Sequence, residues 1–435
     1  MIPADPGGAV RLGGLTLRDH WFDAPLDHAR PDGEQIRVYA REVVAAEKAA
    51  SGAESTLPWL LFLQGGPGGK ANRPESAAGW VGRAVRDFRV LLLDQRGTGR
   101  STPATAATLA TRGDTLAKAE YLAHFRADSI VADAELVRRH LLGTDARWSV
   151  LGQSYGGFCA LTYLSFAPRG LAAAYLTGGL GPLGAGADEV YAATYARVEA
   201  KNDAFHQAFP QAREQLERVA EHLRRHEVRL PDGSLFTVAR LQSLGMALGT
   251  RSALPGLAYL LEEAFVDGVN GAELSDTFLA GAWSRLSFAT NPLYAVLHEP
   301  IYGQAEPTRW AAQRVRDSLP QFASDATPLL LTGEMIYPWM FEVDPALRPL
   351  RATADLLAER SWSPLYDLDA LASCEVPVAA ALYTDDMFVD AELSRRTAAA
   401  VRGLRVWETN AYEHDGLREA DEVLDRLIRM ARGEL

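Results

Sequence analysis

The chain has 435 residues, of which 48% are hydrophobic and 23% are charged, values that are ordinary for a folded globular protein. Its 44 basic and 56 acidic residues give a formal net charge of -12, which disfavours a nucleic-acid partner and offers no basic surface to an anionic membrane. The length exceeds what one minimal core needs, so we expect one large domain with an insertion, or two domains.

Signals for export, membrane insertion and metal binding are missing from the sequence pattern. Residues 1–8 lack a charged start followed by an apolar stretch, so we expect no signal peptide. No uncharged apolar run approaches the roughly 20 residues of a membrane-spanning helix. The two cysteines, Cys159 and Cys374, predict neither a disulfide framework nor a metal site, and no cofactor is implied. We therefore predict a cytoplasmic protein, and a homo-oligomer is compatible with the sequence.

The first part of the chain has the texture of an α/β sheet. Residues 15–22 and 35–44 predict an antiparallel pair with a turn at Asp32-Gly33, followed by a polar loop over 47–56. Continuous short apolar runs are typical of strands buried on both faces by helices. Such runs occur at 59–63, 89–93, 149–151 and 173–176, with helical periodicity between them at 129–142.

From about residue 184 the pattern changes to long helical segments, such as 195–209 and 211–226, and then to aromatic-rich segments. Strand-like runs return at 376–383 and 404–407, and an amphipathic helix is predicted over 420–432. We therefore predict a core made of residues 1–183 and 366–435. A large, mainly helical cap, residues 184–365, is inserted into it after the sixth predicted strand.

One motif carries most of the chemical information. Gly152-Gln153-Ser154-Tyr155-Gly156-Gly157 follows the strand at 148–151 and precedes a helix over 158–164. This is the Gly-x-Ser-x-Gly pattern of a nucleophile elbow, a sharp strand-to-helix turn that exposes one serine hydroxyl. The alternative is a glycine-rich turn with an ordinary serine. The elbow predicts an α/β-hydrolase fold, with a mostly parallel central sheet flanked by helices.

In this fold the triad acid follows the nucleophile along the chain, and the histidine comes last. The strand ending at Tyr383 runs into Asp385 and Asp386, and we prefer Asp386 as the acid because of its distance from Pro377. His414 is the only histidine beyond it. His414 would accept the Ser154 proton and the aspartate would orient the imidazole. The alternatives are a solvated aspartate turn and a solvated loop histidine.

The glycine-rich segment 65–69 directly follows the strand at 59–63. Glycines let the backbone approach a ligand, so we assign the oxyanion hole to the N–H groups of Gly66 and Tyr155, with Gly65 as the alternative to Gly66. A phosphate-binding loop is disfavoured because no Gly-Lys-Ser/Thr ending is present. The loop at 94–101 follows the next strand and is expected to support the glycine-rich segment.

Three segments together resemble the proline iminopeptidases, α/β-hydrolases that remove an N-terminal proline from peptides, and in particular their longer bacterial type. They are residues 65–69, 94–101 and 152–157, in the order and spacing of that family. One departure is Gln64, where many relatives carry histidine before the glycines. The resemblance implies a serine aminopeptidase whose partners are peptides with a free N-terminus.

The resemblance also implies that two cap glutamates bind the substrate ammonium group. Glu334 matches the family segment in which a glutamate precedes a tyrosine by three residues, and Glu299 is the candidate for the second. Either could instead be a surface carboxylate. Tyr337, Trp339 and Phe341 could wall an apolar slot for the pyrrolidine ring, or be plain core residues. Other functions considered are an esterase or small-amide hydrolase with the same triad, and a non-catalytic receptor on this fold.

Overall fold

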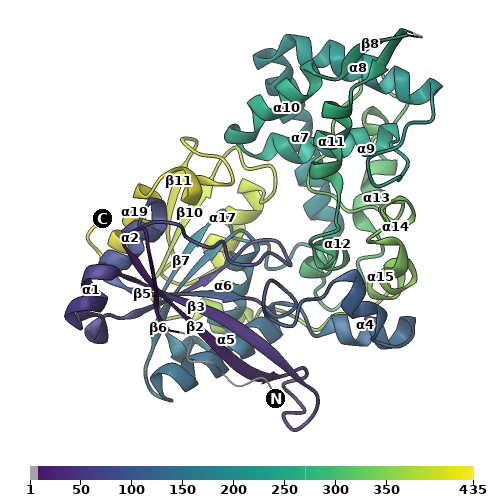
Figure 1. Cartoon of the computed structure of the whole chain (residues 1–435). Coiled ribbons are helices and arrows are strands. Elements are labelled where there is room, and N and C mark those ends of the chain that lie inside the picture. Colours follow the sequence, from purple (N-terminus) through teal and green to yellow (C-terminus); the bar gives the residue numbers. More distant parts are fainter. Residues whose placement is uncertain (1–7, 270) are drawn as a thin grey trace.

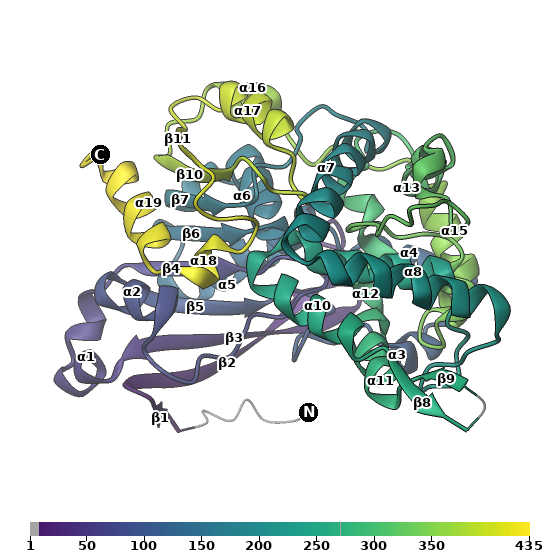
Figure 2. The ribbon, with the colours of Figure 1, turned by 90° about the horizontal axis from the view of Figure 1, so that it is seen from above.

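A nine-stranded sheet forms the centre of the molecule, in the order β1-β2-β3-β5-β4-β6-β7-β10-β11 (Figures 1 and 2). The pairs β1–β2, β2–β3 and β3–β5 are antiparallel, and every later pair is parallel. The computed structural model describes residues 8–269 and 271–435, so the signal-peptide prediction falls largely on residues outside the described ones. The strands are β1 (Val10–Leu12), β2 (Leu15–Pro25), β3 (Gln35–Ala45), β4 (Trp59–Leu63), β5 (Arg89–Asp94), β6 (Trp148–Gln153), β7 (Leu171–Thr177), β10 (Val378–Tyr383) and β11 (Arg405–Thr409).

Helices cover both faces of this sheet, and the strand residues alternate between them. In β4, Leu60 and Phe62 pack into the cluster formed with α2 (Gly79–Asp87) and α19 (Glu422–Arg432), whereas Leu61 and Leu63 face α5 (Ala127–Leu142) and α6 (Tyr155–Phe166). All four side chains are buried. Because side chains alternate along a strand, a continuous apolar run can supply both layers at once. This explains why the central strands could be predicted from apolar runs alone.

The predicted strands agree with the observed ones to within a few residues, but one local prediction is wrong. Residues 47–56 are not a loop: they contain α1 (Ala46–Ser51) and a 3₁₀ turn, η1 (Ala53–Thr56). Alanine, glutamate and lysine in the sequence of α1 are good helix formers, which the polar composition concealed. The short edge strand β1 and the helix α2 were not predicted.

The cap follows β7, which is the sixth of the predicted strands, and stands beyond the core at the upper right of Figure 1. It contains one two-stranded hairpin, β8 (Phe265–Gly268) and β9 (Gly271–Leu274), on its outer edge. Its helices are α7 (Ala187–Ala208), α8 (Pro210–Arg225), α9 (Val238–Gln242), α10 (Leu254–Glu262), α11 (Asp276–Leu286), α12 (Pro292–Leu297), α13 (Ala311–Asp317), α14 (Met340–Val343) and α15 (Arg351–Ala358). The core resumes with α16 (Leu368–Ala372), α17 (Ala391–Ala400) and α18 (Gly416–Glu419).

A segment of the N-terminal part also reaches the cap. Between β5 and α5 lie α3 (Ala106–Ala110) and α4 (Thr115–Ala123), and α4 packs against α15 (Figure 1). Next to α4, the buried Arg126 donates from Nη1 to the Gly303 carbonyl at 3.1 Å and from Nη2 to the Ser363 carbonyl at 2.8 Å. These hydrogen bonds hold the cap against the core at a place distinct from the two points where the chain passes from core to cap and back.

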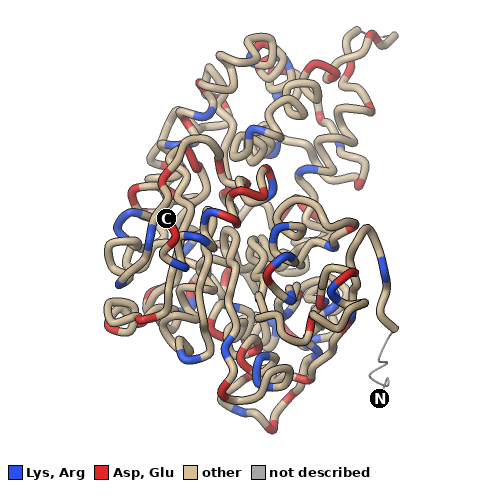
Figure 3. Tube along the Cα trace, turned by 90° about the vertical axis from the view of Figure 1, so that its left-hand side faces the viewer, with Lys and Arg blue, Asp and Glu red and all other residues tan. Residues whose placement is uncertain are grey.

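Charged residues of both signs are interspersed along core and cap (Figure 3). In residues 8–269 and 271–435, no helix has both the length and the apolar composition to cross a bilayer. The same residues contain no group of three or more His, Cys, Asp or Glu arranged to hold a metal ion.

Candidate active site

Ser154 occupies a strained turn between β6 and α6. Its backbone has φ 55° and ψ −127°, a conformation that side chains rarely adopt and that lifts the hydroxyl out of the turn. The flanking glycines are required by space. A Cβ on Gly156 would lie 1.9 Å from the Leu63 carbonyl oxygen, and one on Gly152 would lie 2.3 Å from the Gly156 carbonyl oxygen. The sequence therefore forms an elbow here because nothing larger than glycine fits between β4, β6 and α6.

The structure brings Ser154, His414 and Asp386 together at the carboxyl ends of β6 and β10. His414 Nε2 lies 2.8 Å from Ser154 Oγ, and His414 Nδ1 lies 2.7 Å from Asp386 Oδ2. The other Asp386 oxygen accepts the N–H groups of Phe388 and Val389 at 2.8 and 3.1 Å, which fixes the carboxylate. Asp386 is buried, whereas Asp385 is exposed and makes no contact with the imidazole.

Protonation of His414 is governed by opposing effects. Burial alone would lower the pKa of the imidazole, but the Asp386 carboxylate outweighs burial and the Glu334 carboxylate adds to it, so the pKa is raised. With Nδ1–H donating to Asp386, Nε2 of the neutral ring is left to accept the Ser154 proton. This is the tautomer that general-base catalysis needs.

The glycine-rich segment lies directly against the nucleophile. A Cβ on Gly65 would be 2.8 Å from the Ser154 Cβ, so only glycine allows this approach. Gly66 has φ 136°, in the region that glycine favours. Within the described residues, the N–H groups of Gly66 and Tyr155 donate to no other protein group. Both are therefore free to receive a developing negative charge, and Gly65 stays the alternative to Gly66.

Two neighbouring segments support this loop. Gln95 Nε2 donates to the Gln64 carbonyl at 2.9 Å, while Gln64 Nε2 lies 3.5 Å from Gln153 Oε1. On the cap side, a Cβ on Gly68 would lie 2.7 Å from Asn291 Oδ1, so the start of α12 covers the loop. The glycine-rich segment is thus held between the core and the cap.

Glu334 comes from the cap, and its charge contributes to the raised pKa of the His414 imidazole. Its Oε1 accepts the Tyr294 hydroxyl at 2.5 Å, and its main-chain carbonyl accepts Nε2–H of the buried His298 at 3.0 Å. The Tyr294 and His298 rings stack, with centroids 5.2 Å apart. Tyr294 and His298 therefore fix both the side chain and the backbone of Glu334.

Glu299 is buried deeper in the cap. Its Oε1 accepts the Ala312 N–H at 2.8 Å, and its Oε2 has no partner among the described residues. Burial raises the pKa of this carboxyl from 4.5 to about 7. Burial raises the pKa of the Tyr302 hydroxyl, and the charges of Glu334, Asp386 and Glu299 add to this shift.

Comparison with known proteins identifies the family of the chain. A family model described as the alpha/beta hydrolase fold matches residues 58–419. The chain is 49% identical to a proline iminopeptidase of Aeromonas sobria, over 97% of this chain and 98% of that protein. It is 34% identical to the proline iminopeptidase aneH of Aspergillus aculeatus, over 96% of this chain and 94% of the other. The chain belongs to the proline iminopeptidase family.

The α/β-hydrolase fold expected from the elbow is therefore confirmed, and so is the resemblance on which the substrate class was based. Among solved structures, a proline iminopeptidase of Mycobacterium smegmatis is similar at 14% identity and a TM-score of 0.43, over 96% of this chain and 100% of that one.

Two of the three aromatic residues expected around the pyrrolidine slot are packed inside the cap. Tyr337 is fully buried and its hydroxyl bonds the Tyr195 hydroxyl at 2.7 Å, while Phe341 is fully buried against the edge of Trp310. Both lie in the core of the cap, which favours the alternative that they are core residues. Trp339 stacks on Tyr337 but lines a cavity.

Sequence reasoning missed the partners of Glu334. Tyr294 lies in an aromatic-rich segment without a catalytic motif, and His298 precedes Asp386 along the chain, so the sequence assigns neither a role. The available signal was their spacing of four, which puts two rings on one helical face next to Glu299. The loop that carries His414 has a cap partner as well, an ion pair between Lys201 and Glu413 at 2.5 Å.

Proposed function

We propose that this protein is a serine aminopeptidase that releases N-terminal proline from peptides. The observation that carries the proposal is the continuous set of hydrogen bonds from Ser154 Oγ through His414 to Asp386, at 2.8 and 2.7 Å. Membership of the proline iminopeptidase family supports the substrate class.

In the proposed reaction, Ser154 Oγ attacks the carbonyl carbon of the prolyl residue while His414 Nε2 takes the hydroxyl proton. The carbonyl electron pair moves onto oxygen, and the N–H groups of Gly66 and Tyr155 stabilise that charge. His414 then gives its proton to the leaving amine as the C–N bond breaks, which leaves a prolyl ester on Ser154. Water, deprotonated by His414, attacks the ester and releases proline.

The specificity for a free N-terminus is assigned to Glu334, with Glu299 as the second carboxylate. Glu334 is oriented by Tyr294 and influences His414, so it lies within electrostatic reach of the reacting atoms. Glu299 has an unpaired buried oxygen and a pKa of about 7, and an entering ammonium would relieve the cost of its ionisation. A substrate ammonium group bound beside these two residues would therefore pair with the Glu334 carboxylate and favour the ionisation of Glu299.

The decisive test is a panel of arylamides of proline, alanine and N-blocked proline together with a simple aryl ester. We expect cleavage of the free prolyl arylamide and little of the blocked one, and we expect Ser154→Ala to abolish both. Equal rates on blocked and free substrates would contradict an aminopeptidase and favour the esterase or small-amide hydrolase. Failure of a serine-reactive phosphonate to label Ser154 would favour a non-catalytic receptor.

The role of Glu334 is tested by Glu334→Gln, with Glu306→Gln, an exposed cap carboxylate, as the matched control. A charge-assisted hydrogen bond contributes about 1.5–3 kcal/mol, so kcat/KM for the prolyl arylamide should fall about 10- to 150-fold in Glu334→Gln alone. An unchanged kcat/KM would remove the amine-recognition argument and leave the triad untouched.

We also propose a reducing, cytoplasmic location. Cys159 and Cys374 are free and buried, and Cys159 packs in the elbow helix, where burial raises the pKa of its thiol. Labelling of the two thiols in the unfolded protein, without reductant, should modify both. A disulfide in protein taken from its native cell would contradict this location.

A further inference from the structure

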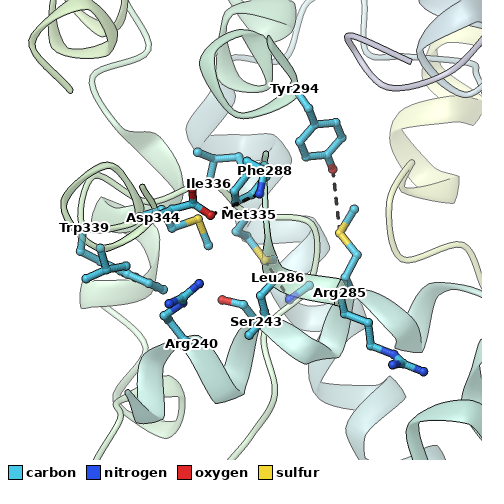
Figure 4. A pocket seen from close by; sticks show the side chains of 14 residues that line it. Arg240, Ser243, Arg285, Leu286, Phe288, Tyr294, Met335, Ile336, Trp339 and Asp344 are labelled. Carbon is cyan, nitrogen blue, oxygen red and sulfur yellow. Dashed lines mark hydrogen bonds between the residues drawn. The ribbon is translucent and has the colours of Figure 1, made fainter. Parts of the chain in front are cut away.

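The cap contains a cavity that the proposed mechanism does not use. It lies between α9, α11, α12 and α14, has a volume of about 90 Å³ and is partly open to solvent (Figure 4). Most of its walls are apolar, from Met246, Leu286, Phe288, Met335, Ile336 and Val343. Neither the triad nor the glycine-rich segment lines it, and Tyr294 stands between this cavity and Glu334.

Arg240 brings an unsatisfied positive group to this apolar space. Its side chain is 3% exposed, and Nη1 donates to Ser234 Oγ at 2.6 Å and to the Leu235 carbonyl at 3.0 Å. Nη2 is buried and has no acceptor among the described residues. Figure 4 shows the guanidinium turned toward the middle of the cavity, between Trp339 and Ser243. A buried N–H without an acceptor is costly, so an acceptor is expected to arrive with a ligand.

A carboxylate of the protein lines the same cavity without neutralising Arg240. Asp344 Oδ1 accepts the Ala346 N–H at 2.8 Å and Oδ2 accepts the Phe288 N–H at 3.2 Å. Among the described residues, no hydrogen bond joins Asp344 to Arg240, whose Nη2 has no acceptor. Each Asp344 oxygen keeps a further lone pair for a donor. The cavity therefore presents a buried guanidinium and a carboxylate on mostly apolar walls, while a second lining arginine, Arg285, donates to the Gly281 and Gly256 carbonyls.

We propose that this cavity binds a free α-amino acid with an apolar side chain. The ligand carboxylate accepts from Arg240 Nη2, its ammonium group donates to Asp344, and its side chain packs on the methionine, isoleucine and valine walls. An α-amino acid carries a carboxylate, an ammonium group and an apolar side chain on one carbon atom. These three groups complement the guanidinium, the carboxylate and the apolar walls of the cavity. Proline, the product of the proposed reaction, belongs to this class, although binding here does not depend on that reaction.

The test is calorimetric titration of Ser154→Ala, which cannot turn over substrate, with L-leucine and L-proline. We expect saturable binding of one molecule per chain. Leucinamide lacks the carboxylate and 4-methylpentanoate lacks the ammonium group, so each should bind at least about tenfold more weakly. Because these comparisons use an unaltered cavity, they need no cap variant to fold. Absence of saturable binding, or leucinamide binding as tightly as leucine, would overturn the proposal.

Variants then locate the binding. Adding Arg240→Gln or Asp344→Asn to Ser154→Ala should weaken leucine at least about tenfold, whereas adding Glu334→Gln should leave leucine binding unchanged. Loss of binding in the Glu334→Gln protein, with Arg240→Gln neutral, would place the amino acid at the amine-recognition site and overturn the assignment to the cavity. The same outcome would leave the proposed aminopeptidase intact, so the two claims fail separately.

Discussion

His414 lies where burial and a neighbouring carboxylate oppose each other, and the carboxylate prevails. Because the base must be neutral to accept the Ser154 proton, a raised pKa moves the acid limb of the rate profile upward. We expect kcat/KM for the prolyl arylamide to fall as pH is lowered through a value above 6.5, the ordinary pKa of histidine. A pH profile measured between 5 and 9 checks this expectation. An acid limb below 6.5 would contradict it.

Asp386 is the source of that shift, so its removal has two separate effects. Asp386→Asn should lower kcat by about 10⁴-fold, because the amide no longer selects the working tautomer of His414. It should also move the acid limb to lower pH. Asp385→Asn is the matched control, since Asp385 is exposed and adjacent, and its kinetics should match the unaltered protein. Comparable losses in both variants would argue for a general disturbance of the turn.

Glu299 makes stability depend on pH in the opposite way to most carboxylates. Its pKa is raised from 4.5 to about 7, so the folded protein favours the protonated carboxyl. The stability that this preference contributes is fully present below the pKa of the unfolded chain, 4.5, and is lost as pH rises through about 7. At about 1.4 kcal/mol per pKa unit, the loss is about 3 kcal/mol. Glu299→Gln should therefore melt above the unaltered protein at pH 8, with a smaller difference at pH 5. Thermal unfolding at both pH values, with Glu306→Gln as control, tests this.

If Glu299 also binds the substrate amine, the more stable Glu299→Gln variant should have the lower kcat/KM. A gain in stability with unchanged kinetics would assign Glu299 to the cap structure alone.

At the scale of elements, the elbow depends on how closely α6 approaches β4. A Cβ on Gly156 would lie 1.9 Å from the Leu63 carbonyl oxygen, which is backbone and cannot swing aside. Gly156→Ala should therefore separate β4 from α6, with a loss of stability of about 3 kcal/mol or more and nearly complete loss of activity. In Gly184→Ala, where an added Cβ meets nothing within 4 Å, both should be preserved. Melting temperature and arylamide turnover measure the two effects.

The sequence predicted elements where one physical requirement dominated. Continuous apolar runs identified the central strands because both sheet faces are covered, and the elbow was recognised because only glycine fits beside Ser154. Chain order alone then selected His414. The edge strand β1 is exposed along its length, so no apolar run marked it. The helix α1 has no buried residue, so composition was its only signal.

Cap residues were harder to assign because their partners are distant in sequence. Tyr294 and Glu334 are 40 residues apart and meet only through tertiary packing. Tyr337 and Phe341 were candidates for ligand-binding aromatic residues, but both side chains are fully buried in the cap interior. A resemblance could suggest Glu334, whereas the ring pair that orients it had to be found in the structure.

For the whole molecule, Arg126 is one of the buried residues that link core and cap. It donates to two cap-side carbonyls and lies 4.6 Å from the Trp362 ring centroid. Arg126→Met should lower the free energy of unfolding by about 2–4 kcal/mol, since both carbonyls lose a charged donor. Arg360 approaches the same ring at 5.6 Å but pairs with Glu120 near the surface, so Arg360→Met should cost less than about 1 kcal/mol. Urea unfolding compares the two, and equal losses would contradict the link.

Ser154 and His414 are separated by 260 residues, and the entire cap is encoded between them. When the ribosome has synthesised Ser154, the histidine that activates this serine has not yet been made. An incomplete nascent chain therefore cannot cleave the N-termini of other chains. It can do so only after the cap has been synthesised and the final strands have joined the sheet. The insertion thus separates the synthesis of the nucleophile from the synthesis of its base by the length of the whole cap.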